Sequence, residues 1–141
     1  MNVSLVQADL IITGAIAEAR ARKAKSLAVI VLDAGGHPVA FRREDKASLY
    51  RHDIAKAKAM GALGMGVDTR VMAERAAKNP TFFASITSIP GVDLPYSPGG
   101  NLIKDASGEI IGAIGISGDT GEVDEACAIA GIMSANLHCG E

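Results

Sequence analysis

The strongest constraint on the fold is a pattern that occurs twice, in which an Asp-Ala-x-Gly turn separates two apolar, strand-forming segments. The first copy joins residues 27–32 to 38–41 through Asp33, and the second spans residues 102–114 with Asp105 in the turn. Glycine adopts positive φ without steric cost, and Asp side chains accept hydrogen bonds from nearby backbone amides in turns. Both copies therefore predict a β-hairpin of antiparallel strands.

Helical patterns surround the two hairpins. We expect helices over residues 4–23, 48–63 and 69–78, and a last helix that begins after Gly118 and continues to about residue 137. Ser4 is the expected N-cap of the first helix, and its expected core positions are Val6, Leu10, Ile12, Ile16 and Ala19. Asp119 and Glu122 have the spacing of a capping box at the start of the last helix.

The order of these elements predicts an α+β fold with an antiparallel sheet. Successive strands are joined by short hairpin turns, whereas parallel strands would need long, usually helical, crossover connections. Residues 89–100 hold three prolines and three glycines, which predicts a long loop. A length of 141 residues with 48% apolar residues predicts one domain, residues 1–141.

Charge and composition exclude several classes of partner. The net charge of −2 leaves no basic excess for nucleic acid or anionic membranes. The apolar segment 5–19 contains Asp9 and Glu18 and has no basic region before it, so we expect neither a secretory signal nor a membrane span. With two cysteines and no ligand spacing around them, we expect a reduced, cytoplasmic protein without a metal site.

His52 is the leading candidate functional residue. On a helical wheel it shares a stripe with Leu49, Ala55, Ala59 and Leu63, which predicts that it faces the sheet. Such a histidine can be structural, an acid/base, or an axial ligand of haem iron, and the sequence leaves these three open.

Two further groups are candidates for binding an anion. Arg43 and Asp45 lie two residues apart at a strand end and hence on one face, where they could orient a carboxylate ligand or pair with each other. Gly99 and Gly100 would let a ligand approach backbone amides closely. Glycine clusters at 61–66 and 112–118 lack the placement of a nucleotide-binding loop, so no nucleotide cofactor is expected.

The chain resembles the GlcG/HbpS-like family over roughly residues 5–135. The matching segments are residues 31–37 with 40–41, the R-x-D-x-A of 43–47, residues 58–59, residues 99–100, and residues 111–119 leading to 124–126. The resemblance implies a profilin-like fold, association with haem, and dimer-based homo-oligomers, commonly octamers. Lys46 stands where the family usually has glycine, and Asn101-Leu102 stands where Val-Pro or Leu-Pro is common.

Three functions remain in competition at this stage. The resemblance implies a small-ligand or haem-binding protein. Because haem ligands are not a uniform motif of the family, no ligand position carries over, and His52 as the ligand is our own hypothesis. The other candidate binding residues are Arg51, Gly99 and Gly100, with Phe41, Met60 and Leu63 as walls. The alternative is a cofactor-independent isomerase or lyase for a small oxo- or hydroxy-acid. There His52 would move the proton, Arg43 would hold the carboxylate, and the Gly100 amide would stabilise the enolate. The third is an accessory subunit without chemistry of its own.

Overall fold

The computed structural model describes residues 1–92 and 94–140, which form an α+β fold. Its helices are α1 (Leu5–Ala21), α2 (Arg51–Met65), α3 (Thr69–Lys78), α4 (Pro80–Ile86) and α5 (Gly121–Ser134). Its strands are β1 (Ala28–Asp33), β2 (Pro38–Arg43), β3 (Gly100–Lys104) and β4 (Ile110–Ser117). Among the helices in these ranges, none has the length and hydrophobicity of a membrane-spanning segment.

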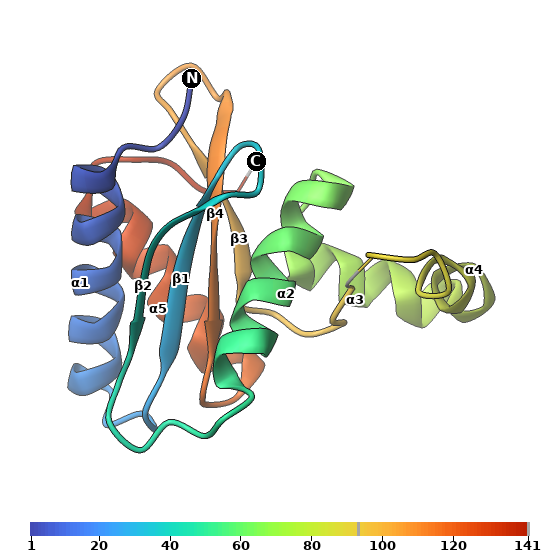
Figure 1. Cartoon of the computed structure of the whole chain (residues 1–141), viewed down its shortest axis with the longest axis horizontal. Helices are drawn as coiled ribbons and strands as arrows, with labels where there is room; N and C mark the ends of the chain where they lie inside the picture. Colours follow the sequence, from blue (N-terminus) through green and yellow to red (C-terminus); the bar gives the residue numbers. More distant parts are fainter. Residues whose placement is uncertain (93, 141) are drawn as a thin grey trace.

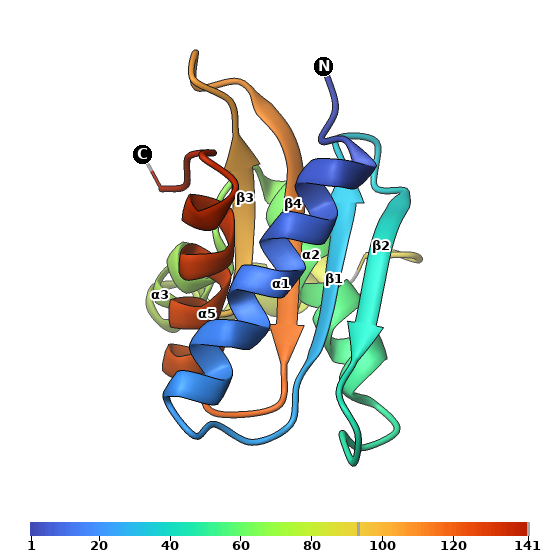
Figure 2. The ribbon, with the colours of Figure 1, turned by 90° about the vertical axis from the view of Figure 1, so that its left-hand side faces the viewer.

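The four strands form one antiparallel sheet in the order β2-β1-β4-β3. Helices α1 and α5 cover one face and α2 covers the other (Figures 1 and 2). The central strands β1 and β4 are buried on both faces, which explains why their sequences are almost continuously apolar. The expected α+β class and antiparallel sheet are confirmed.

Both predicted hairpins form, and their turns use the same chemistry. Asp33 Oδ1 accepts hydrogen bonds from the amides of Gly35 and His37, and Asp105 Oδ1 accepts them from Ser107 and Glu109. Gly36 and Gly108 take φ values of 84° and 87°, a region that favours glycine. The repeated sequence pattern thus encodes a repeated turn geometry.

The second turn gives a pH-dependent prediction. Hydrogen bonds hold the pKa of Asp105 below its ordinary value of 3.8, and the bond from the Ser107 hydroxyl is the largest cause. As pH falls, the Asp105 carboxylate of the unfolded chain is protonated before that of the folded chain. The stabilisation by Asp105 is therefore complete above about pH 4 and is lost as pH falls through the lowered pKa of the folded state. In urea unfolding, Asp105→Ala should therefore be less stable than the wild type at pH 7. A difference that stays the same at pH 3 would contradict this account.

Helix α1 is shorter than expected, and its predicted core stripe is confirmed only in part: Ile12 and Ala19 are buried, and Ile16 packs against the core. Ser4 does cap it, in a capping box with Gln7. However, Val6 and Leu10 are 71% and 49% exposed, and the buried positions are Ala8, Ile11, Ile12, Ala15 and Ala19. The reason is close packing of α1 on α5, where an added Cβ at Gly14 would collide with Ser134. The contact stripe therefore follows the small residues.

Helix α5 begins one residue later than expected. Thr120, rather than Asp119, is the N-cap, and its hydroxyl accepts a hydrogen bond from the Val123 amide. The Asp119 carboxylate instead accepts from the amides of Lys25 and Thr120. The helix ends at Ser134, after which His138 pairs with Lys104 of β3 in an isolated bridge.

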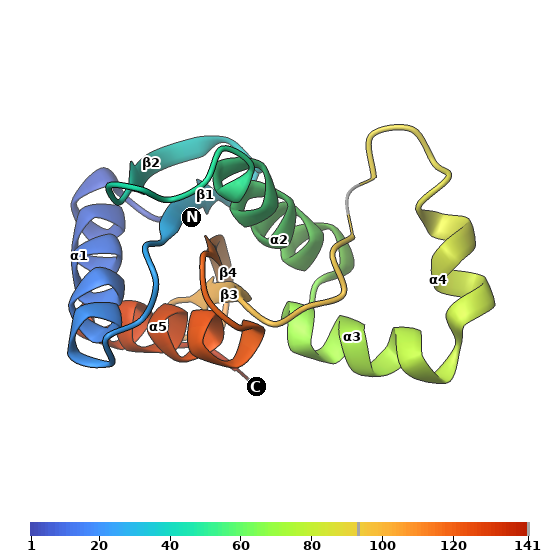
Figure 3. The same cartoon turned by 90° about the horizontal axis from the view of Figure 1, so that it is seen from below.

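Helices α3 and α4 form an arm that projects away from the sheet (Figures 1 and 3). Helix α3 has the expected bounds, whereas α4 was not predicted because Asn79-Pro80 reads as a stop. Pro80 instead occupies the first turn of a new helix, where a missing amide costs nothing. The arm has a small core of its own, made by Met72, Ala76, Phe83 and Leu94.

The outer edge of β3 is closed by the base of this arm and by the C-terminal segment. Among the outward amides of β3, that of Gly100 donates to the Thr69 hydroxyl and that of Leu102 to the Asp68 carboxylate. The outward amide of Lys104 donates to the His138 carbonyl. At the opposite edge, β2 begins with Pro38, and no hydrogen bond from its outward-facing amides is found within the described residues.

Candidate functional site

Helix α2 lies unusually close to the sheet, and this fixes where its functional side chains sit. Its buried face consists of small residues, chiefly Ala55, Ala59 and Ala62. Beneath them, a Cβ added at Gly115 of β4 would collide with the carbonyl of Ala55. The backbone of α2 thus rests almost directly on β4, and its flanks overhang the neighbouring strands.

His52 lies on the flank of α2 that faces β2, not in the interior. Its side chain is 44% exposed, so the expected inward orientation is wrong. The stripe of Ala55 and Ala59 fills the space against the sheet and displaces the larger imidazole to the edge. There the ring meets Phe41 edge-to-face, with centroids 4.7 Å apart at 77°. Asp53 Oδ1 lies 3.8 Å from Nδ1, beyond hydrogen-bonding distance.

Arg43 lies on the same side of β2 as Phe41, because residues two apart on a strand share a face. Their cross-strand partners on β1, Ala28 and Ile30, belong to the core beneath α2. Arg43 and Asp45 are both exposed, and no ion pair between them is found. The intramolecular pairing that the sequence left open is therefore not made.

The structure does not bring the glycine pair or Arg51 to this surface. Gly99 and Gly100 are buried, and the Gly100 amide donates to Thr69 Oγ1 at 2.9 Å. The expectation that this amide stabilises an oxyanion is wrong, since its proton is already bonded. Arg51 turns to the other flank of α2 and donates to Ser117 Oγ at 3.1 Å.

A buried ion pair, which sequence reasoning missed, joins α2 to α5. Lys58 Nζ lies 3.2 Å from Asp124 Oδ2 and donates to the Ile116 carbonyl at 2.9 Å. Asp124 Oδ1 accepts from the Asp119 amide. Burial is the main cause that lowers the pKa of Lys58 and raises that of Asp124. Lys58 and Asp124 are far apart in the sequence and meet only in the folded chain, so no local pattern could predict their contact. The only sequence signal was that both lie in segments that resemble the family.

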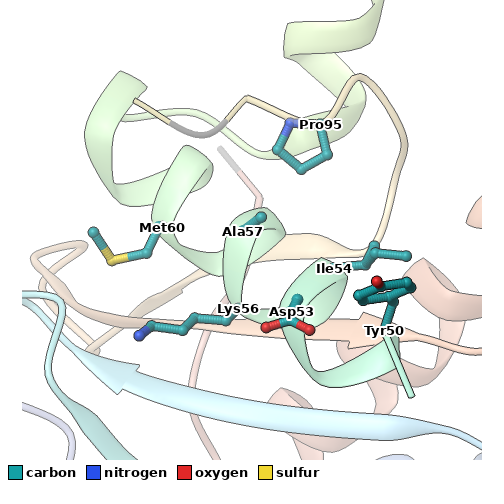
Figure 4. Close-up of a pocket in the computed structure, with 7 residues that line it drawn as sticks. All are labelled: Tyr50, Asp53, Ile54, Lys56, Ala57, Met60 and Pro95. Carbon is teal, nitrogen blue, oxygen red and sulfur yellow. The ribbon is translucent and has the colours of Figure 1, made fainter. Parts of the chain in front are cut away.

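An open cleft of about 600 Å³ lies on the outer face of α2 (Figure 4), and two of its lining residues, Asp53 and Lys56, neighbour His52 on the helix. It is lined by Tyr50, Asp53, Ile54, Lys56, Ala57, Met60 and Pro95. In Figure 4, the side chains of Lys56 and Met60 extend to one side of α2, and Pro95 comes from a separate loop beside the helix. Of the expected walls, Met60 lines this cleft, Phe41 contacts His52, and Leu63 packs against the core under α2.

We call Phe41, Arg43, His52 and Lys56 the His52 surface. Its chemistry combines an accessible imidazole, an aromatic ring and two cations beside a partly apolar cleft. Within the described residues, no cluster of three His, Cys, Asp or Glu side chains could hold a metal ion directly. Burial raises the pKa of Cys127 to about 11, so this cysteine is a protonated core residue.

A family model described as haem degrading protein HbpS-like matches residues 3–133. The chain belongs to this HbpS-like family. Among curated proteins, none matches the chain.

Solved structures support the fold of this HbpS-like protein. A PduOC:heme complex is 22% identical, with a TM-score of 0.88, and the match covers 100% of both chains. HbpS is 28% identical, with a TM-score of 0.81, over 94% of this chain and 89% of that one. The Klebsiella pneumoniae protein ORFY is 22% identical, with a TM-score of 0.84, over 95% and 90%.

Proposed function

We propose that this protein binds haem at the His52 surface, with the imidazole of His52 as an axial ligand of the iron. The observation that carries the proposal is the position of His52, half-exposed and held against Phe41 beside a cleft. A half-exposed imidazole can meet an incoming haem without any displacement of the core, so this position is compatible with ligation. The family assignment and the structural likeness to a haem complex add support.

The residues present fit the group. Histidine is a common axial ligand, and Phe41 offers an aromatic surface to a porphyrin ring. The cleft adds apolar surface from Ile54, Ala57 and Pro95 and lies within the size range of small-molecule sites. When bound, haem would supply an iron centre for redox chemistry. The chain's own part is to orient the imidazole, cover one side of the ring and attract its charged groups.

The isomerase or lyase alternative has weaker support. His52 and Arg43 remain on one surface, as that hypothesis requires. Its third component is missing, because the Gly100 amide is buried and already donates to Thr69. A dimer-based homo-oligomer stays a prediction.

A haemin titration tests the proposal. We expect a saturable shift of the Soret band with wild-type protein. His52→Ala should weaken binding about tenfold or more, equivalent to at least about 1.4 kcal/mol of lost iron–imidazole bonding. His138→Ala is the matched control, because His138 is exposed and lies after α5.

Circular dichroism would verify that both variants fold, since neither histidine belongs to the buried core. An equal response of the wild type and His52→Ala would rule out His52 as the ligand. Loss of the shift in His138→Ala alone would move the site to the C-terminal segment.

A further inference from the structure

Helices α1 and α5 lie at the surface, yet their outward sides are as uncharged as a core. Figure 2 shows the two helices side by side in front of the sheet, and no other described segment covers them. Surface helices normally turn charged residues to water, as α3 does with Glu74, Arg75 and Lys78. The residues along the outward midline of α1 and α5 carry no charge, and we call them the outer stripe: Val6, Leu10, Thr13, Ala17 and Ala21 of α1, with Ala126, Ala130 and Met133 of α5.

The outer stripe exposes large apolar side chains to water. Met133 is 63% exposed, and Val6 and Leu10 are exposed as described above. A contiguous apolar patch of this kind marks an interaction surface. Two packed helices of this length cover roughly 25 Å by 20 Å, so a pair of such patches would bury about 1,000 Å² in total, near the lower limit of specific interfaces.

The side-chain sizes along α1 indicate which partner fits the stripe. The bulky residues Val6 and Leu10 lie in the N-terminal half of the helix. The small residues Ala17 and Ala21 lie at the mirrored positions of its C-terminal half. A second, antiparallel copy of α1 therefore places Leu10 against the partner's Ala17 and Val6 against the partner's Ala21. Large residues then meet small ones along the whole helix, which allows close packing.

The charges beside the stripe fit the same arrangement. Asp9 lies in the first half of α1 and Arg20 at its end, about three turns later and hence on one flank of the helix. Both side chains remain half-exposed, although Asp9 pairs with Arg42 and Arg20 with Glu44 in their own chain. An antiparallel pair brings Asp9 close to the partner's Arg20 on both sides of the two-fold axis, whereas a parallel pair would bring like charges together. The patch is thus complementary to itself, which favours a second copy of this chain over an unrelated partner.

We propose that two copies of this chain pack face to face through their outer stripes, with the two α1 helices antiparallel about a two-fold axis near Thr13 and Gly14. This interface lies on the opposite face of the sheet from α2 and leaves the His52 surface of each copy free. The proposal therefore goes beyond haem binding and does not depend on it.

Sedimentation of the purified full chain, from roughly 1 to 100 µM, tests the interface. We expect a wild-type mass at least twice that of one chain. Leu10→Glu and Met133→Glu each place an unpaired charge in the interface and should weaken association about tenfold or more. Phe82→Glu is the matched control, because Phe82 is a large apolar residue, 51% exposed, on the projecting arm. Circular dichroism verifies that the variants fold, since all three side chains are exposed within one chain.

Two results would overturn the interface. One is a wild type that sediments as a single chain at the highest concentration. The other is an association that Leu10→Glu leaves unchanged, above all if Phe82→Glu abolishes it and so moves the contact to the arm.

Disulfide cross-linking tests the antiparallel direction. Leu10→Cys and Ala17→Cys are combined in a Cys139→Ser background, which removes the partly exposed native thiol. Within one helix the two positions are about 10 Å apart, too far for a disulfide. A mild oxidant should therefore convert the Leu10→Cys/Ala17→Cys protein into covalent dimers on a non-reducing gel, and neither single cysteine variant should follow. Efficient cross-linking of Leu10→Cys alone would mean parallel helices and overturn the arrangement, as would failure of the double variant to cross-link.

Discussion

Replacing Gly115 by alanine is expected to lower the free energy of unfolding by about 3 kcal/mol or more, a large fraction of the stability of a typical domain. The added Cβ would collide with the Ala55 carbonyl and would also lie 3.0 Å from the Ala59 amide nitrogen. Both contacts are backbone atoms, which cannot rotate away as a side chain would. Relief requires α2 to lift from the sheet, and this would loosen the small-residue packing beneath it.

Gly64→Ala provides the matched control for this prediction. Gly64 lies in the same helix, but a Cβ added there meets no atom within 4 Å. Since alanine favours helix over glycine, this variant should be equal to the wild type or more stable by up to about 1 kcal/mol. Urea unfolding followed by circular dichroism measures both variants. Similar stabilities of Gly115→Ala and the wild type would mean that α2 does not rest on β4 as closely as described.

Removing Lys58 should also be strongly destabilising. Lys58→Met leaves the buried carboxylate of Asp124 without its cation, and breaking such a pair typically costs about 3–5 kcal/mol. Burial already raises the pKa of Asp124 above its ordinary value of 3.8, and loss of Lys58 should raise it further. The folded variant then binds a proton that the unfolded chain releases. Its destabilisation should therefore be small near pH 4 and increase as pH rises.

Two comparisons test this explanation. The double variant Lys58→Met/Asp124→Asn removes both charges, so it should be more stable at pH 8 than Lys58→Met and lose the added pH dependence. Arg22→Met breaks the exposed pair with Glu18 and should cost about 1 kcal/mol or less. If Lys58→Met unfolds with the same midpoint as the wild type at pH 8, the buried pair makes no net contribution.

Local patterns in the sequence were enough to predict most of the fold. The Asp-Ala-x-Gly turns encode both hairpins through side-chain-to-backbone bonds within four residues. The bounds of α3 also follow from local signals. Errors arose where tertiary packing decides, as at Val6 and Leu10, whose exposure depends on how closely α5 approaches α1.

The candidate site was less predictable for the same reason. A helical wheel identified the small stripe of α2 but placed His52 within it, because the wheel does not show that Gly115 brings the helix too close for an imidazole. Phe41 and His52 were both selected from sequence, and the structure brings their rings into contact. The ion pair of Lys58 and Asp124 forms only once α2, β4 and α5 are packed together. No spacing of residues along the sequence predicts such a contact.

The closed edge of β3 limits how this protein can associate. Its outward amides are already bonded to Thr69, Asp68 and His138, so no further strand can be added there. A sheet that accepts strands at both edges can polymerise without end, whereas a sheet with one sealed edge cannot. Any edge-to-edge association must therefore stop at two chains, which makes the arm's contacts with β3 a safeguard against fibre growth.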